Sequence, residues 1–359
     1  MMGLCAIECE GMSSFMITAR IAALACAVPK EQVDLMHLGF DAETMQRTMK
    51  LTGVHTVRYA PPGKTAADYC LRAAQEILEK TNIQSETIDG IVFATPHPDY
   101  IYPGNCSIIQ KELDLSKKCV VMDVNHSCTG MVYGLYLADL LVRSGDARNV
   151  LVCCGDTASH HIHPKDRALR MVVGDGGAAA LVSRGGRKTA QYSFCHDGGG
   201  LRFLYTPAGG ERMPRCAGIT DVEKTDAEGN IRTLEDEYMD GMEVMRFVLN
   251  EVPMLIDNVL AKSGWCRADA AVYAMHQANE FILKSLMRAM HLKKDAVLVD
   301  IDGYGNIGGA SLVLALCHAH EKPHEPWGKA VLAGFGTGLS GAAMAADLTD
   351  TDIFRVLEC

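Results

Sequence analysis

The most constraining feature of the sequence is a repeated alternation between short apolar runs and amphipathic stretches. The apolar runs are rich in Val, Ile and Ala and occupy residues 90–95, 119–124, 149–154, 270–275, 296–300 and 329–334. Runs of this length are typical of strands that helices bury on both faces. Residues 65–80 and 129–143 carry apolar residues at helical spacing, and Gly145 is a candidate C-cap. The pattern predicts an α/β protein.

The length and composition favour two domain-sized halves. The chain has 359 residues, 48% of them hydrophobic, so it can bury a large core. We expect an N-terminal extension at residues 1–15, a first half at 16–185 and a second half at 186–359, with a polar linker near 183–189. A glycine-rich, charged region at about 196–237 is predicted to be an insertion, followed by a long helix at about 239–262.

The charge and cysteine content exclude several classes of protein. A formal net charge of -10 argues against a general affinity for nucleic acid or anionic membranes. No segment has the roughly 18 to 20 unbroken apolar residues of a membrane span. The 14 cysteines are scattered along an enzyme-sized chain, which predicts reduced thiols in a cytoplasmic protein.

Cys128 lies where a predicted strand gives way to a predicted helix, in the segment Asp-Val-Asn-His-Ser-Cys-Thr-Gly at residues 123–130. A thiol at a helix start is close to the positive end of the helix dipole and to free backbone N–H groups. Both stabilise a thiolate and can bind a developing oxyanion. Cys128 is therefore a candidate nucleophile, although it could also be one of many buried thiols.

Two polar side chains in the second half are also candidate catalytic groups because of where they lie. His276 ends a predicted strand, where a neutral imidazole can donate a hydrogen bond or handle protons near neutral pH. Asn306 lies in a glycine-rich turn, where its amide can donate to an oxygen that becomes negative. A glycine-rich loop at residues 334–341 ends another predicted strand.

These segments together resemble the β-ketoacyl-acyl-carrier-protein synthase III family of the thiolase superfamily. The resemblance covers nearly the whole chain from about Met16 and depends on the Cys128 segment, His-Gln-Ala-Asn at 276–279, Tyr-Gly-Asn at 304–306 and Phe-Gly-Thr-Gly at 335–338. It implies the thiolase fold, in which two similar halves, each with a mixed five-stranded sheet, form α/β/α/β/α layers. It also implies a homodimer.

The resemblance implies an acyltransferase that condenses two thioesters. Cys128 would take an acyl group from acyl-coenzyme A or acyl carrier protein, with its own N–H and that of Thr337 as the oxyanion hole. His276 and Asn306 would stabilise the enolate formed when a malonyl-type thioester, most simply malonyl carrier protein, loses carbon dioxide. Asn279 would support the site. The reaction needs no metal and no redox cofactor, and it belongs to fatty-acid or specialised-metabolite (polyketide) synthesis.

Other matched positions imply substrate contacts. Arg167 is a candidate phosphate contact, Val173 and Phe335 are candidate pocket residues, and Tyr102 matches a loop that enters the partner's pocket in family dimers. The sequence departs from the family at Leu51, where family members that use coenzyme A often carry an arginine, with a tryptophan nearby that is also missing here. This departure favours a carrier-protein donor.

Several alternatives remain open. The same scaffold could pass the acyl group to a hydroxyl or an amine, or serve as a silent subunit of a heterodimer. A degradative thiolase is disfavoured because Thr337 stands in the C-terminal loop without a second cysteine, and a plant-type polyketide synthase has a different histidine motif. His160, His161 and His163 could bind zinc, but no cysteine or carboxylate set with the usual ligand spacing accompanies them, so we expect no metal.

Overall fold

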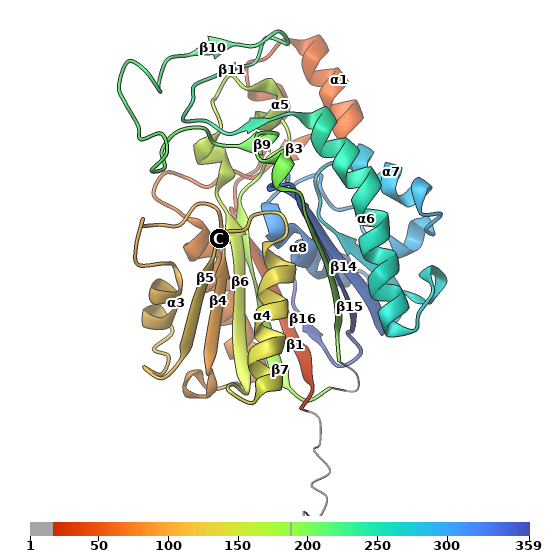
Figure 1. The fold of residues 1–359 in the computed structure, drawn as a ribbon. Helices are drawn as coiled ribbons and strands as arrows, with labels where there is room; N and C mark the ends of the chain where they lie inside the picture. The colour runs from red at the N-terminus through yellow and green to blue at the C-terminus, as the bar shows by residue number, and fades with distance from the viewer. Residues whose placement is uncertain (1–16, 187–188) are drawn as a thin grey trace, which may run out of the picture.

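The computed structural model describes residues 17–186 and 189–359, and they form two mixed β-sheets with helices between and outside them (Figure 1). The predicted extension at residues 1–15 lies outside the described residues. In the described part of the chain, no helix is both long enough and apolar enough to cross a membrane.

The first sheet has the strand order β16-β1-β7-β6-β4-β5, with β17 also paired to β1. β1 is antiparallel to β7 and β7 to β6, whereas β6, β4 and β5 run parallel, so the sheet is mixed. The strands are β1 (Ala19–Val28), β4 (Gly90–Ala94), β5 (Val120–Val124), β6 (Asn149–Asp156), β7 (Gly176–Arg184), β16 (Asp352–Ile353) and β17 (Leu357–Glu358). The end of the chain therefore pairs with the first strand of the first half, and the boundary proposed near residue 185 stays a prediction.

The second sheet has four strands in the order β13-β14-β15-β8. They are β8 (Gln191–His196), β13 (Val272–Met275), β14 (Lys329–Gly336) and β15 (Ser340–Asp347), with only β13 and β14 parallel. The strand predicted at 296–300 is wrong, because this segment makes a single bridge from Val297 to Tyr273. The side chain of Gln277 hydrogen-bonds the carbonyl of Leu298 and the N–H of Asp300, which occupies backbone groups that a fifth strand would have paired.

Helices fill three layers around the two sheets, so the predicted thiolase fold and its five layers are confirmed. The prediction of five strands in each sheet is wrong, because the C-terminal strands β16 and β17 join the first sheet to give seven strands, and the second sheet has four. α2 (Ala66–Thr81) and α3 (Cys106–Glu112) cover the outer face of the first sheet, and α6 (Gly241–Ser263) and α7 (Glu280–Ala289) cover that of the second. α4 (Gly130–Ser144) and α8 (Ser311–His320) pack between the sheets in one continuous apolar core. α4 ends at Gly145, which has a φ of 90°, as the sequence predicts.

Shorter elements form a cap over the open ends of the sheets, at the top of Figure 1. The cap contains β2 (Val33–Asp34), β3 (Thr56–Val57), α1 (Ala42–Thr52), α5 (Arg167–Arg170), β9 (Leu204–Tyr205) paired with β12 (Tyr238–Met239), and the hairpin β10 (Lys224–Thr225) with β11 (Ile231–Arg232). The region predicted as an insertion lies here. Short 3-10 helices occupy Leu35–His37, Ser85–Thr87, Ala158–His161, Gly198–Gly200, Arg267–Asp269, Lys294–Ala296 and Gly308–Ala310.

Candidate active site

Cys128 lies in the turn between β5 and α4, two residues before the helix begins. The backbone N–H of Thr337 donates a hydrogen bond to its sulfur. The end of β14 approaches the thiol so closely that a Cβ on Gly336 would lie 2.6 Å from Sγ. The strand end, the turn and the loop at Thr337 therefore fix the sulfur beside a backbone donor, as an oxyanion hole requires.

The free thiol differs from the sequence-based expectation of a stabilised thiolate. Burial raises the pKa of Cys128, and the charges of Glu237 and Asp156 raise it further, whereas the Thr337 N–H and the Ser127 hydroxyl lower it. The expectation considered only the helix start and the N–H groups, but removal of the sulfur from water is the larger effect. Cys128 therefore needs a base when it attacks.

His276 follows β13 and is only 2% exposed. Its Nδ1 lies 3.0 Å from the carbonyl oxygen of Gly308 and 2.9 Å from the hydroxyl of Ser311. A carbonyl can only accept, so the contact with Gly308 favours the tautomer with the proton on Nδ1 and Nε2 as an acceptor, whereas the Ser311 hydroxyl can pair with either tautomer. Burial lowers the pKa of His276 to about 4, which keeps the ring neutral at physiological pH.

Asn306 is held by backbone bonds to the segment that contains Val173. Its N–H donates to the Val172 carbonyl at 2.8 Å, and its own carbonyl accepts from Gly174 at 3.0 Å. The side-chain Oδ1 accepts from the Gly308 N–H at 3.0 Å. This bond fixes the orientation of the amide and leaves its NH₂ group as a donor for the cavity that Asn306 lines.

One cavity of about 300 Å³ brings these side chains together. Of the residues that the sequence singled out, it is lined by Cys128, His276, Asn306, Asn279, Thr337, Phe335 and Val173. Asn279 also caps α7 by accepting a hydrogen bond from the Ile282 N–H at 2.8 Å. A sulfur nucleophile, an imidazole and a carboxamide share this space, which is the arrangement that acyl transfer from a thioester requires.

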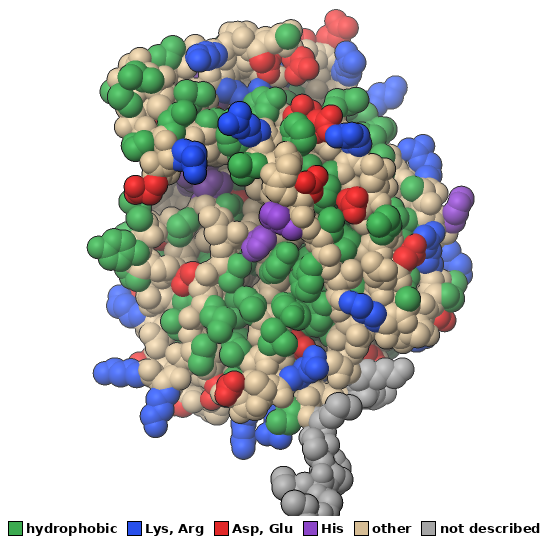
Figure 2. Space-filling view, viewed as in Figure 1, with side chains coloured by type: hydrophobic (Ala, Val, Ile, Leu, Met, Phe, Trp, Pro, Cys, Tyr) green, Lys and Arg blue, Asp and Glu red, His purple; other side chains and the backbone are tan. Residues whose placement is uncertain are grey.

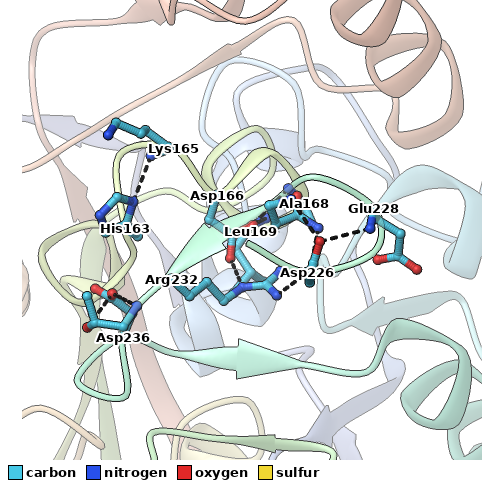
Figure 3. A network of polar contacts seen from close by, with 11 residues as sticks. His163, Lys165, Asp166, Ala168, Leu169, Asp226, Glu228, Arg232 and Asp236 are labelled. Carbon is cyan, nitrogen blue, oxygen red and sulfur yellow. Dashed lines mark hydrogen bonds and ion pairs between the residues drawn. The ribbon is translucent and has the colours of Figure 1, made fainter. Parts of the chain in front are cut away.

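Arg167 and Tyr102 do not line this cavity. Tyr102 is 85% exposed, and the guanidinium of Arg167 donates to the Glu228 carbonyl and lies 3.7 Å from an Asp41 carboxylate oxygen. The Glu228 segment is held over α5 because Arg232 pairs with both Asp166 and Asp226 (Figure 3). The candidate phosphate contact therefore already has partners from the cap.

Sequence reasoning missed a polar group beside the nucleophile. Asp156, at the end of β6, is 4% exposed and accepts from the Ser127 hydroxyl at 3.2 Å. His97 Nδ1 lies 2.8 Å from the same carboxylate, and Glu237 lines the cavity with Cys128. Asp156 could have been found by its position at a strand end. Glu237 lies in the aperiodic insertion, where no pattern signals it.

The three histidines considered for zinc have separate partners. His160 Nε2 lies 2.9 Å from the Ala60 carbonyl oxygen, His161 stacks on His97 with ring centroids 3.7 Å apart, and His163 Nε2 lies 3.3 Å from Glu223. Across the residues that the structure describes, no group of three or more His, Cys, Asp and Glu side chains could hold a metal ion.

The chain is similar to known proteins in both sequence and structure. The family model described as 3-oxoacyl-[acyl-carrier-protein] synthase III matches residues 122–198, and its C-terminal counterpart matches 260–348. A β-ketoacyl-[acyl-carrier-protein] synthase III of Caldanaerobacter subterraneus is 34% identical over 315 residues, which cover 85% of this chain and 91% of that relative. The crystal structure of a 3-oxoacyl-(acyl-carrier protein) synthase from Burkholderia xenovorans matches with a TM-score of 0.87 at 31% identity, covering 95% of this chain and 97% of that one. The chain therefore belongs to the β-ketoacyl-acyl-carrier-protein synthase III family of condensing enzymes, which are acyltransferases of the thiolase fold.

Proposed function

We propose that the protein transfers an acyl group to Cys128 and then joins it to a malonyl-type nucleophile with loss of carbon dioxide. The observation that carries the proposal is that Cys128, His276 and Asn306 all line one cavity. The reaction would supply a β-ketoacyl thioester for fatty-acid or specialised-metabolite synthesis.

In the first step, the Cys128 sulfur attacks the acyl thioester. His276 Nε2 accepts the thiol proton and returns it to the departing thiol, so the S–C bond that forms replaces the one that breaks. The N–H groups of Cys128 and Thr337 receive the developing oxyanion. A raised thiol pKa and an unprotonated Nε2 both support this role for His276, because the sulfur needs a base and the base is free.

In the second step, the malonyl-type thioester loses carbon dioxide, and the electron pair of the broken C–C bond forms an enolate. The Asn306 NH₂ donates to the enolate oxygen, and His276 donates from Nε2 in the tautomer that carries its proton there. The Ser311 hydroxyl is compatible with this tautomer, because it can donate to a bare Nδ1 at the same 2.9 Å. The enolate carbon then attacks the acyl carbonyl and releases Cys128 as a thiolate.

The cavity mouth favours an acyl carrier protein as donor. Thr48, Leu51 and Thr52 of α1 line the mouth, and Leu51 is 54% exposed. No aromatic side chain of α1 (Ala42–Thr52) is present to stack on an adenine ring. A carrier protein presents only the phosphopantetheine arm to the cavity, so it does not require that contact.

We also propose a homodimer. β5 is an edge strand with a 45% exposed Val121, and the nearby residues Ile101 and Tyr102 are 100% and 85% exposed. Exposed apolar residues beside an unpaired strand edge are typical of an interface. Figure 2 shows a broad apolar area on one face of the molecule.

Intact-protein mass spectrometry tests the function in two stages. Incubation with a panel of acyl thioesters should add the acyl mass to Cys128 and add nothing to Cys128→Ala. Malonyl carrier protein should then remove the adduct and yield a β-ketoacyl product. No adduct with any donor would favour a silent subunit, whereas an adduct that only alcohols or amines remove would favour an ester- or amide-forming transferase.

A further inference from the structure

A second cavity lies beside the one that holds the candidate catalytic residues. It has a volume of about 490 Å³ and shares Ser127, Leu204, Glu237 and Thr337 with the first cavity. Ser127 precedes Cys128 in the chain and the Thr337 N–H contacts its sulfur, so the wall that the two cavities share lies beside the candidate nucleophile. We call the second cavity the polar chamber. A hollow that contains histidine side chains is visible in Figure 2.

The polar chamber is lined by more titratable groups than a cavity for an alkyl chain would need. Its walls include His97, His161, Arg215, Glu235 and Glu237, in addition to apolar residues such as Leu201 and Leu204. Arg215 and Glu235 pair with each other at 3.4 Å. Within residues 17–186 and 189–359, no hydrogen bond or ion pair joins the Glu237 carboxylate to another side chain.

The wall that carries Glu237 is fixed in place. The Glu237 N–H donates to the His161 carbonyl at 2.9 Å, and β12, which begins at the next residue, pairs with β9. Arg232, five positions earlier, pairs with the buried Asp166 (Figure 3). The carboxylate is therefore presented to the chamber by a rigid segment, as a preorganised binding group would be.

We propose that the polar chamber binds a neutral hydroxyl group carried by the acyl chain on Cys128, so that the preferred starter is a hydroxyacyl thioester. This inference rests on the proposed acylation of Cys128. A hydroxyl can donate to Glu237 and accept from His97 when Nε2 of that ring carries a proton, because Nδ1 already bonds Asp156, so one group satisfies both kinds of partner.

The other substituents fit less well. A plain alkyl chain would displace water from Glu237 and His97 and leave them without partners. A carboxylate would meet Glu237 and Glu235, and Arg215 in the chamber wall is already paired with Glu235. An ammonium group would suit Glu237 but would face His97, whose pKa is raised by its Asp156 partner. Burial of an added charge would also cost free energy that a hydroxyl avoids.

Competition between matched donors tests the proposal. Butyryl-, 3-hydroxybutyryl-, 3-aminobutyryl- and glutaryl-pantetheine are mixed in equal amounts, and the adducts on Cys128 are measured by intact mass at early times. We expect the hydroxybutyryl adduct to exceed the butyryl adduct about tenfold, which is the usual effect of one hydrogen bond to a charged group. Equal or reversed amounts would overturn the proposal, and a dominant aminobutyryl or glutaryl adduct would overturn it in favour of a charged starter.

Two variants and a control link the preference to Glu237. Glu237→Leu should reduce the ratio of hydroxybutyryl to butyryl adduct to about one, and Glu237→Gln should reduce it by a smaller factor because the amide still forms hydrogen bonds. Glu223→Gln removes a carboxylate from the same insertion outside the chamber and should leave the ratio unchanged. The ratio is taken within each variant, so a poorly folded protein does not mimic the result. Absence of every adduct would contradict the proposed function itself, whereas adducts with an unchanged ratio in Glu237→Leu would contradict only the hydroxyl preference.

Discussion

The two sides of Cys128 are built from different kinds of groups. On one side, His276 and Asn306 are oriented by neutral partners, namely the Gly308 carbonyl and N–H and the Ser311 hydroxyl. On the other side, Asp156 and Glu237 place carboxylates near the sulfur, and His97 Nδ1 lies 2.8 Å from Asp156. The first side suits charge that develops during reaction, because its dipoles are fixed and carry no net charge.

The carboxylates of Asp156 and Glu237 raise the pKa of the Cys128 thiol. They therefore oppose thiolate formation and do not activate the nucleophile. A group that works against the resting nucleophile and still lines the cavity is better explained by substrate recognition. We therefore propose that His276 and Asn306 serve the chemistry and that Glu237 selects the acyl chain. The following experiments test this division.

The largest effect should come from Asn306→Ala. Loss of the NH₂ donor should slow release of carbon dioxide from malonyl carrier protein by roughly 10²- to 10³-fold, whereas the rate of Cys128 acylation should change little. Carbon dioxide release and adduct mass measure the two steps separately in the same preparation. Loss of acylation with intact decarboxylation would contradict the role given to Asn306.

Gly336→Ala should also reduce the rate strongly. The added Cβ would lie 2.6 Å from Sγ and 2.9 Å from Cβ of Cys128, and Gly336 has a φ of 153°, so the sulfur or the loop must move. A displacement of about 1 Å can cost roughly 10²-fold in rate. Gly198→Ala is the matched control because a Cβ there meets nothing within 4 Å. Equal acylation rates for the two variants would contradict the close approach of β14 to the thiol.

The two sides also differ in how far the sequence predicts them. Cys128 and His276 follow strands whose apolar runs can be recognised, and Asn306 lies in a recognisable glycine-rich turn, whereas the family resemblance is what implies that the three side chains meet. Glu237 and His97 lie in loops without periodicity, and their neighbours are set only by tertiary packing. The raised pKa of Cys128 was missed for the same reason, because desolvation depends on the whole surrounding fold and not on a local motif.

Glu237→Gln should produce a smaller change in the pH dependence of the thiol. Burial and the charge of Asp156 raise the pKa of Glu237 to about 7, so above that pH its carboxylate is ionised and raises the pKa of Cys128. Asp166 and His97 also act on this carboxylate, with opposite signs. Removal of the negative charge should lower the pKa of the thiol and increase alkylation by iodoacetamide at pH 8 by about threefold, because a larger share of the thiol is then ionised.

The midpoint of the alkylation profile should move to lower pH in Glu237→Gln and stay fixed in Glu223→Gln. Iodoacetamide is neutral and small, so the measurement reports thiolate formation and not binding of an acyl donor. A midpoint that moves upward would mean that Glu237 assists ionisation of Cys128, and the division between the two sides would then fail.

The smallest effect is expected for Arg167→Ala. The side chain of Arg167 is 29% exposed, and its guanidinium donates to the Glu228 carbonyl and lies 3.7 Å from Asp41, so a phosphate group would have to compete with existing partners. Exposed ion pairs of this kind contribute roughly 0.5 kcal/mol, so KM for acyl-coenzyme A should rise by about twofold. Lys165→Ala removes a nearby cation that pairs with Glu223 and serves as the control. A much larger rise for Arg167 alone would mean that Arg167 leaves its partners in the cap to bind a phosphate. The cap would then take part in binding the carrier as well as in selecting the acyl chain.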